Sequence, residues 1–374
     1  MATDAGIDFC VHALIPGRDP FMKYEYLPSA ALAVMLGMPA AFAADGIVLA
    51  EPEAAEYMRV CDIYGAGFYY IPGTEHCLRM SGYAQYDVGV GDLFGRTSWD
   101  KKNGAPDQND TYFKRSRVTL QLDSRTETEL GTLRSYTELF LDDGSTRDAY
   151  SNTGFSWELK HAFIELGGLR VGKSDSLFKT FTLAGGKVIN EQLVPFAPVP
   201  TNQISYTFKG SNGFSSLIAL EQGHGTNTID SYVPHIVAGA GFKQKWGSVI
   251  GVAGYDSNYE EWAAKLRLDL NVGEAISLWA MVGYGSDDHV AKSFYKPWGG
   301  NWAVWGGGSA RVSRKATTNL ALGYDEDKNF AAIANVVYSV VPGFFVQPEV
   351  AYKDRLKTSG DGELGGWLRI RRSF

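Results

Sequence analysis

Apolar and polar residues alternate along most of the chain from residue 78 to its end. The clearest segment is residues 262–270, WAAKLRLDL, in which Leu266 and Leu268 fall on one face while Lys265 and Arg267 fall on the other. A period of two places successive side chains on opposite faces of a β-strand, whereas a helix would scatter them around its circumference. The pattern therefore predicts a two-faced strand.

Sixteen segments of this kind can be counted, and turns rich in Gly, Asn, Asp or Ser separate them. Alternating segments of about ten residues are typical of outer-membrane barrel strands, and an even count places both ends of the barrel on the periplasmic side. We predict an all-β transmembrane antiparallel β-barrel of 16 strands within residues 78–374. The strands are expected at residues 78–90, 112–123, 132–142, 156–166, 168–173, 202–208, 213–221, 235–243, 246–256, 261–270, 274–284, 301–312, 316–324, 329–341, 343–352 and 364–374.

Alternation alone does not decide which face meets water, because the strands of a soluble sandwich also alternate. Here the polar faces carry arginines in several segments, and aromatic residues lie near predicted strand ends, at Tyr86, Trp262, Tyr284, Tyr324 and Tyr352. Aromatic residues at such positions fit the girdles at the two interfaces of a membrane. We therefore expect the apolar faces to meet lipid and the polar faces to line a water-filled interior.

The N-terminal region has the features of a signal peptide. Residues 29–43 form an apolar run that ends in Ala41-Phe42-Ala43, which predicts a signal peptide over residues 1–43 and cleavage after Ala43. Because the basic residue before the run follows Met22, we interpret residues 1–21 as upstream sequence before a start at Met22. The run is shorter than the roughly 20 apolar residues that a membrane-spanning helix needs. The alternative is a buried helix of a cytoplasmic protein.

The exported chain keeps two cysteines, Cys61 and Cys77, in a short N-terminal segment over residues 44–77. An even pair in an oxidising compartment predicts a disulfide. Two cysteines are too few for a zinc site, and the neighbouring His76 does not complete one.

Composition and motifs give no support for catalysis or nucleic-acid binding. The net charge is −7, and the histidines are scattered without metal-binding spacing. The glycines at 65–67 and 306–308 lack the helix-opening context of a dinucleotide loop, and no Gly-x-Ser-x-Gly motif is present. We therefore expect no catalytic residues, metal or cofactor. Two other functions stay open: an outer-membrane barrel enzyme of the lipase or protease type, and a secreted β-rich binding protein.

The last residues, GGWLRIRRSF, complete a predicted final strand that ends in Phe374. Leu368 and Ile370 share a face with Phe374, and Arg369 and Arg371 lie opposite. A final strand that ends in phenylalanine is the usual outer-membrane assembly signal, so we expect it to engage the barrel-assembly machinery.

Residues 60–88, VCDIYGAGFYYIPGTEHCLRMSGYAQYDV, resemble the opening of the alphaproteobacterial (Rhizobiales-type) general porins. The similarity continues with TETE at 126–129, GTLRSY at 131–136, AFI at 162–164 and the WLR…R…F ending at 367–374. The resemblance implies a homotrimer in the outer membrane, surrounded by outer-membrane lipids and lipopolysaccharide. It also implies passive diffusion of small hydrophilic solutes and ions, with the third extracellular loop folded into the channel.

On this reading a basic wall of the channel would face an acidic loop. Asp175 and Glu191 would lie on the inward loop, although residues 173–200 also carry three lysines where relatives are more acidic. Opposed charges would orient dipolar solutes, and we expect the arginines to set conductance and a mild anion preference. The alternative is that they only solvate the wall. The predicted wall residues are Arg79, Arg115, Arg117, Arg134, Arg170, Arg369 and Arg371.

Overall fold

The structure is a computed structural model that describes residues 59–100, 102–144, 154–355 and 362–374. The described residues belong to one compact unit, Glu56–Phe374. A second unit, Met1–Ala55, lies outside the described residues, and with it the predicted signal peptide, the cleavage site after Ala43 and the proposed start at Met22.

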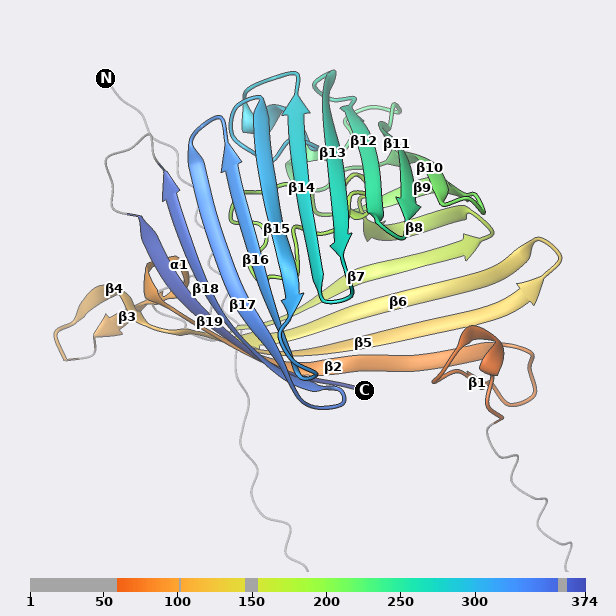
Figure 1. Ribbon diagram of the computed structural model, residues 1–374, viewed down its shortest axis with the longest axis horizontal. Helices are drawn as coiled ribbons and strands as arrows, with labels where there is room; N and C mark the ends of the chain where they lie inside the picture. The colour runs from red at the N-terminus through yellow and green to blue at the C-terminus, as the bar shows by residue number, and fades with distance from the viewer. Residues whose placement is uncertain (1–58, 101, 145–153, 356–361) are drawn as a thin grey trace, which may run out of the picture. The chain divides into compact units, whose positions relative to one another are not determined.

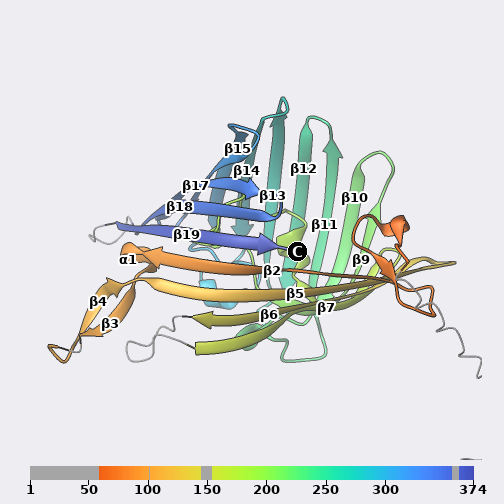
Figure 2. The same ribbon diagram turned by 90° about the horizontal axis from the view of Figure 1, so that it is seen from below.

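Sixteen antiparallel strands form one closed sheet, in which each strand pairs with its neighbours in the chain and the last pairs with the first (Figures 1 and 2). Closure leaves no unpaired sheet edge, as a barrel within lipid requires. The barrel strands are β2 (Cys77–Val90), β5 (Phe113–Thr128), β6 (Gly131–Gly144), β7 (Gly154–Leu166), β8 (Leu169–Asp175), β9 (Pro200–Lys209), β10 (Phe214–Glu221), β11 (His235–Gln244), β12 (Gly247–Asp256), β13 (Glu261–Val272), β14 (Ile276–Gly285), β15 (Trp302–Arg311), β16 (Ala316–Asp325), β17 (Asn329–Val341), β18 (Phe344–Arg355) and β19 (Glu363–Ser373).

The sixteen predicted strands are confirmed, and the differences lie at their ends. The largest is in β5, which runs to Thr128 although alternation predicted an end at Asp123. The extension is polar on both faces and lacks an apolar pattern. It is held by a tight turn in which the Thr128 hydroxyl donates to the Gly131 carbonyl at 2.6 Å.

The remaining elements lie in the connections. A short strand β1 (Tyr69–Tyr70) pairs with the start of β2, and β3 (Arg96–Asp100) and β4 (Ala105–Thr111) form a separate hairpin between β2 and β5. The helices are single turns: α1 (Gly91–Phe94), α2 (Leu177–Thr180), η1 (Asp62–Tyr64), η2 (Gly225–Asn227) and η3 (Val290–Lys292). No helix within the described ranges is long and apolar enough to cross a membrane.

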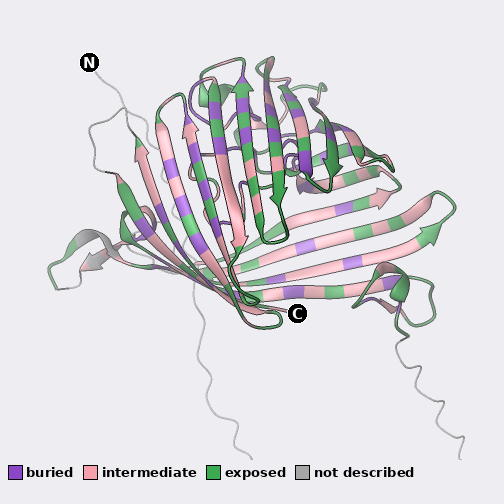
Figure 3. Cartoon of the chain, viewed as in Figure 1, coloured by how far each residue is buried: buried purple, intermediate pink, exposed green. Residues whose placement is uncertain are grey.

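The two faces of the strands point as the sequence predicted. In β13, Leu266 and Leu268 are 53% and 38% exposed, while Lys265 and Arg267 are 3% and 4% exposed. Buried and exposed residues alternate in the same way along the neighbouring strands (Figure 3). The apolar face is therefore the outer face of the barrel, and the charged face points inward.

Aromatic side chains line one end of strands β13 to β18, on the side of the barrel where residues 286–301 connect β14 to β15. Trp262 lies 5.8 Å from Tyr284 between ring centroids, and Trp302 lies 5.9 Å from Tyr324. Tyr352 lies 6.3 Å from Phe330. These rings form a band across β13 to β18 at the level expected for one membrane interface.

One expectation fails along part of the inner wall, where the inward side chains are small and apolar rather than polar. Val237, Ala263 and Ala303 are fully buried. They pack in one cluster with Phe178 and Phe196, which belong to the connection between β8 and β9. The inner face is apolar there because it is covered by protein and does not meet water.

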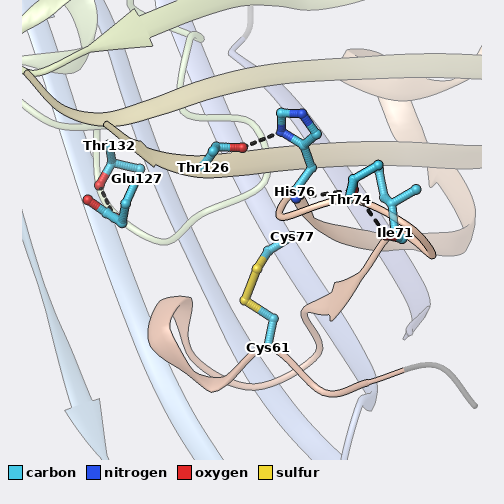
Figure 4. Close-up of a disulfide and its surroundings, with 8 residues drawn as sticks. All are labelled: Cys61, Ile71, Thr74, His76, Cys77, Thr126, Glu127 and Thr132. Atoms are coloured by element: carbon cyan, nitrogen blue, oxygen red, sulfur yellow. Dashed lines mark hydrogen bonds between the residues drawn. A yellow bond between two sulfur atoms is a disulfide. The ribbon is translucent and has the colours of Figure 1, made fainter. Parts of the chain in front are cut away.

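The predicted disulfide joins Cys61 to Cys77, at a Cα–Cα distance of 6.0 Å (Figure 4). It ties the segment before β1 to the first residue of β2. Phe68 packs against the disulfide. The guanidinium of Arg79 lies over the Phe68 ring at 4.7 Å from its centroid, which connects this segment to the inner wall.

Candidate functional site

The candidate site is the interior of the barrel, which has two contrasting parts. One part is an arginine wall on β19, β2, β5, β6 and β8. The other is the connection between β8 and β9, residues 176–199, which contacts the inward side chains of β13, β15, β17 and β18. The arginine wall consists of the predicted Arg79, Arg115, Arg117, Arg134, Arg170, Arg369 and Arg371, together with Arg125.

Strand register brings residues far apart in sequence into adjacent rows of the wall. Arg371 of β19 lies opposite Gln85 of β2, which lies opposite Arg117 of β5. In the next row, Arg369 lies opposite Asp87, and Asp87 opposite Arg115. Because β19 pairs with β2, the two ends of the barrel sequence build one continuous surface.

Asp87 is the centre of the first cluster. Its side chain is fully buried and receives Arg115 at 2.6 Å and Arg369 at 2.8 Å. The Trp367 indole N–H also donates to this carboxylate, at 3.3 Å. Two guanidinium groups on one buried carboxylate leave a local excess of one positive charge.

Arg117 and Arg371 differ in their partners, although they share a row. Arg117 forms a bidentate pair with Asp142, with both distances 2.6 Å. Arg371 donates from Nε and Nη2 to the Gln85 amide oxygen, and its guanidinium lies 4.0 Å from the Tyr83 ring centroid. The charge of Arg371 is therefore oriented by neutral groups and is not neutralised by a carboxylate.

A second cluster lies nearer the disulfide end of the wall. The buried Asp123 carboxylate accepts from Arg79 at 3.3 Å, Arg125 at 2.8 Å and Arg134 at 2.9 Å. Arg134 also pairs with Glu165 at 2.7 Å. The remaining predicted wall residue joins this cluster too, because Arg170 pairs with Glu165 at 2.6 Å.

The arginine wall keeps a positive excess after this pairing. Its eight arginines stand beside five inward carboxylates, an excess of three positive charges when His161 is counted as neutral. The five carboxylates are Asp87, Asp123, Glu138, Asp142 and Glu165. The sequence analysis did not single them out as site residues, although each lies directly across from an inward-facing residue of a neighbouring strand.

The two acidic residues predicted to face the wall have other partners. Asp175, at the end of β8, lies 3.4 Å from Lys160 and 3.8 Å from the His161 ring. Glu191 lies 3.9 Å from Lys179 and accepts a hydrogen bond from the Gly185 N–H at 3.0 Å. Burial raises the pKa of Glu191 above its usual 4.5.

Glu349 holds residues 176–199 against the inner face of β18. This carboxylate is 2% exposed and accepts from the backbone N–H groups of Ile189 at 2.5 Å and Asn190 at 3.0 Å. Asn335 of β17 donates to Glu349 at 2.9 Å and to the Lys187 carbonyl at 3.1 Å. A buried carboxylate thus orders a loop backbone through several charge-assisted hydrogen bonds.

Other inward side chains hold the rest of this loop. Lys265 donates to the Phe196 carbonyl at 3.0 Å, Arg267 to the Ala184 carbonyl at 2.6 Å, and the Trp305 indole to the Val194 carbonyl at 3.0 Å. Sequence reasoning placed Lys265 and Arg267 on the inward face but did not connect them to the loop. No pattern in the sequence specifies which carbonyl a lysine will bind.

Helix α2 begins the loop and is fixed in a similar way. Glu221, at the end of β10, accepts from the Ser176 hydroxyl at 2.8 Å and from the Leu177 N–H at 2.9 Å. The Tyr295 hydroxyl, from the connection between β14 and β15, donates to the same carboxylate at 3.1 Å. Two loops and one strand therefore meet at Glu221.

Nothing in the described part of the chain is arranged for metal chemistry, because no group of three His, Cys, Asp or Glu side chains there could hold an ion. The interior instead contains the charged arginine wall beside the loop of residues 176–199. A closed sixteen-stranded barrel with an apolar outer belt and a charged inner wall is an outer-membrane channel.

Comparison with known proteins gives the same class and adds the family. A family model described as "Porin subfamily" matches residues 45–367. Porin Omp2b of Brucella neotomae is 42% identical over 376 residues, which cover 94% of this chain and all of the relative. The chain belongs to this porin family, and it is an outer-membrane general porin, a channel and not an enzyme.

Solved structures agree at the level of the fold. The outer membrane channel DcaP of Acinetobacter baumannii matches with a TM-score of 0.60 at 15% identity, over 82% of this chain and 99% of that chain. A mutant of the Rh. blastica porin matches with a TM-score of 0.55 at 14% identity, over 79% of this chain and 100% of the other.

Proposed function

We propose that this porin passes small hydrophilic solutes and ions by passive diffusion, with residues 176–199 narrowing the channel and the arginine wall favouring anions. The observation that carries the proposal is the excess of three positive charges on the wall. Selectivity in a pore depends on the diameter and the charges at its narrowest part. A fixed positive wall there attracts anions and repels cations.

The contacts of the loop support a permanent narrowing of the channel. Its backbone is bound by side chains of five strands, β10, β13, β15, β17 and β18. Its aromatic residues Phe178 and Phe196 are buried against the wall on that side. The free path is therefore left beside the arginine wall. Solutes cross between a basic surface and a loop that carries Lys179 and Glu191.

Recordings in planar bilayers test this proposal with the double variant Arg115→Ala, Arg117→Ala. Removing two charges lowers the wall's positive excess from three to one and leaves Asp142 without its guanidinium partner. The preference for chloride over potassium should therefore fall by about twofold or more, most clearly in dilute salt. The matched control Lys102→Ala, Lys245→Ala removes two exposed charges from connections between strands and should leave selectivity unchanged. Unaltered selectivity and conductance in the wall variant would remove these arginines from the narrow part of the channel.

We also propose a homotrimer that is exported by a signal peptide over residues 1–43 and inserted by the barrel-assembly machinery. The position of Phe374 supports the last step: its N–H and carbonyl exchange hydrogen bonds with Gly82 of β2, both at 3.0 Å, and its ring is exposed. The end of the chain thus takes part in closing the barrel. Closure of single channels in three equal steps would support the trimer, and single-step closure would oppose it.

A further inference from the structure

An apolar hollow of about 800 Å³ lies on the outer face of the barrel across β14 to β18. Register aligns its centre in one row, because Leu278 pairs with Gly308, Leu320 with Ala334, and Ala334 with Val350. Gly308 and Ala334 are small and stand beside larger residues, which are 46% exposed at Leu278 and 58% exposed at Val350. The hollow therefore opens toward lipid.

The hollow lies in the half of the barrel that faces the periplasm. It borders residues 307–310 and 318–320, just before and after the short turn that joins β15 to β16. Short turns of such barrels face the periplasm, whereas the long loops are extracellular. Below the hollow, the exposed Tyr338 and Val312 mark the approach to the membrane interface.

The rim beneath the hollow carries a basic turn between β15 and β16, and one acidic residue, Glu274, in the turn before β14. The β15–β16 turn reads Val312-Ser313-Arg314-Lys315, with an arginine before it, and neither this turn nor the next one, at residues 342–343, contains an acidic residue. Lys315 already donates to the Val340 carbonyl at 3.1 Å, which holds its ammonium at the rim. The apolar hollow matches the acyl chain of a phospholipid, and the two cations beneath it match a headgroup phosphate at the periplasmic interface.

We propose that this surface binds one anionic glycerophospholipid of the periplasmic leaflet. An acyl chain fills the hollow between Leu278 and Val350, and the phosphate lies at Arg314 and Lys315. A second copy of the chain is the less fitting occupant, because an apolar partner surface would leave these two cations without a counter-charge. The site lies on the outer face and is separate from the channel.

Native mass spectrometry of the folded porin in mild detergent tests the site, with phosphatidylglycerol and phosphatidylethanolamine of the same acyl chains as probes. The wild type should retain one phosphatidylglycerol per chain in preference to phosphatidylethanolamine. The variant Arg314→Gln, Lys315→Gln should retain it about 25-fold less, because each basic residue near a lipid surface contributes about fivefold. Ala334→Leu should also lower retention by filling the hollow.

Matched controls separate the site from general detergent or charge effects. Ala253→Leu enlarges an outward alanine on β12, and Lys245→Gln removes the cation of the β11–β12 turn. Both variants should retain lipid as the wild type does. Equal retention by the wild type and both site variants would overturn the proposal. So would a lack of preference between the two lipids, or disulfide cross-linking between Ala334→Cys chains in membranes, which would place a second copy on the surface.

Discussion

At the scale of single residues, the proposed anion preference depends on what each arginine is paired with. Six of the seven predicted wall arginines have a carboxylate partner. Among the residues that the structure describes, Arg371 contacts the Gln85 amide and two aromatic rings. A guanidinium held by a neutral acceptor keeps its full charge available to a passing anion. Arg371 should therefore influence selectivity more than its paired neighbours do.

Replacing Arg371 by glutamine removes one of the three excess charges of the wall and leaves no carboxylate unpaired. The anion preference, measured as reversal potential across a salt gradient, should fall by about a third to a half without loss of folded protein. Arg371→Lys is the matched control and should restore most of the preference. A reversal potential that does not move in the glutamine variant would show that this residue lies outside the conducting path.

Alternation predicted the inward arginines, but it could not predict their partners. Parity assigns a residue to a face, whereas an ion pair also depends on register between strands far apart in sequence. Asp87 and Arg369 lie almost a whole barrel apart in the sequence. They meet only because β19 pairs with β2 and closes the barrel. The importance of Asp87 and Asp123 therefore became visible only in the structure.

At the scale of elements, the loop 176–199 and the part of the inner face that it covers are both apolar where they meet. The loop supplies Phe178 and Phe196, and strands β11, β13 and β15 supply Val237, Ala263 and Ala303. Near these positions β11 and β15 are apolar on both faces, and in β13 the charges of Lys265 and Arg267 mark the inward face but not the part of it that a loop covers. The loop could be assigned to the interior only through resemblance, and its anchoring residue Glu349 could not be assigned at all.

The variant Glu349→Gln tests how firmly the loop is held. The amide keeps the shape but loses the charge and can accept fewer of the N–H groups of residues 189 and 190, at a cost of about 1–3 kcal/mol. We expect larger or noisier single-channel currents, because the proposed narrowing of the channel by residues 176–199 requires the loop to be held in place. Glu363→Gln, at the start of β19, is the control. If Glu349→Gln channels show unchanged conductance and no added current noise, other contacts hold the loop in place.

The disulfide contributes to the stability of the folded barrel and not to conduction. It closes a loop with a sequence separation of 16, so the double variant Cys61→Ser, Cys77→Ser should unfold more easily by about 3 kcal/mol in the chain-entropy description. Denaturation of the folded barrel in urea, with and without reductant, measures this difference. Conductance should be unchanged, because the disulfide lies at the first residue of β2 and neither cysteine belongs to the arginine wall. A reduced wild type as stable as the oxidised one would contradict this role.

At the scale of the whole molecule, the strands and their number followed from a two-residue period repeated sixteen times. Each segment alone gives a weak signal. In a closed barrel, however, the apolar faces of all sixteen strands must point to the same side of the sheet, and this requirement makes the combined pattern reliable. The interior departs from the pattern where a loop covers it. Contact with lipid therefore requires apolar residues all along the outer face. The polarity of the inner face varies with whether water or the loop lies against it.

The central claim is that the polar face lines water and the apolar face meets lipid, and adjacent residues of β5 test it most directly. Gln121 faces inward, where the Ser81 hydroxyl donates to it at 3.2 Å, and Leu120 is on the opposite face. A charged, membrane-impermeant thiol reagent should lower the current of single Gln121→Cys channels in steps and leave Leu120→Cys channels unaffected. Block of Leu120→Cys channels with Gln121→Cys channels unchanged would contradict the account.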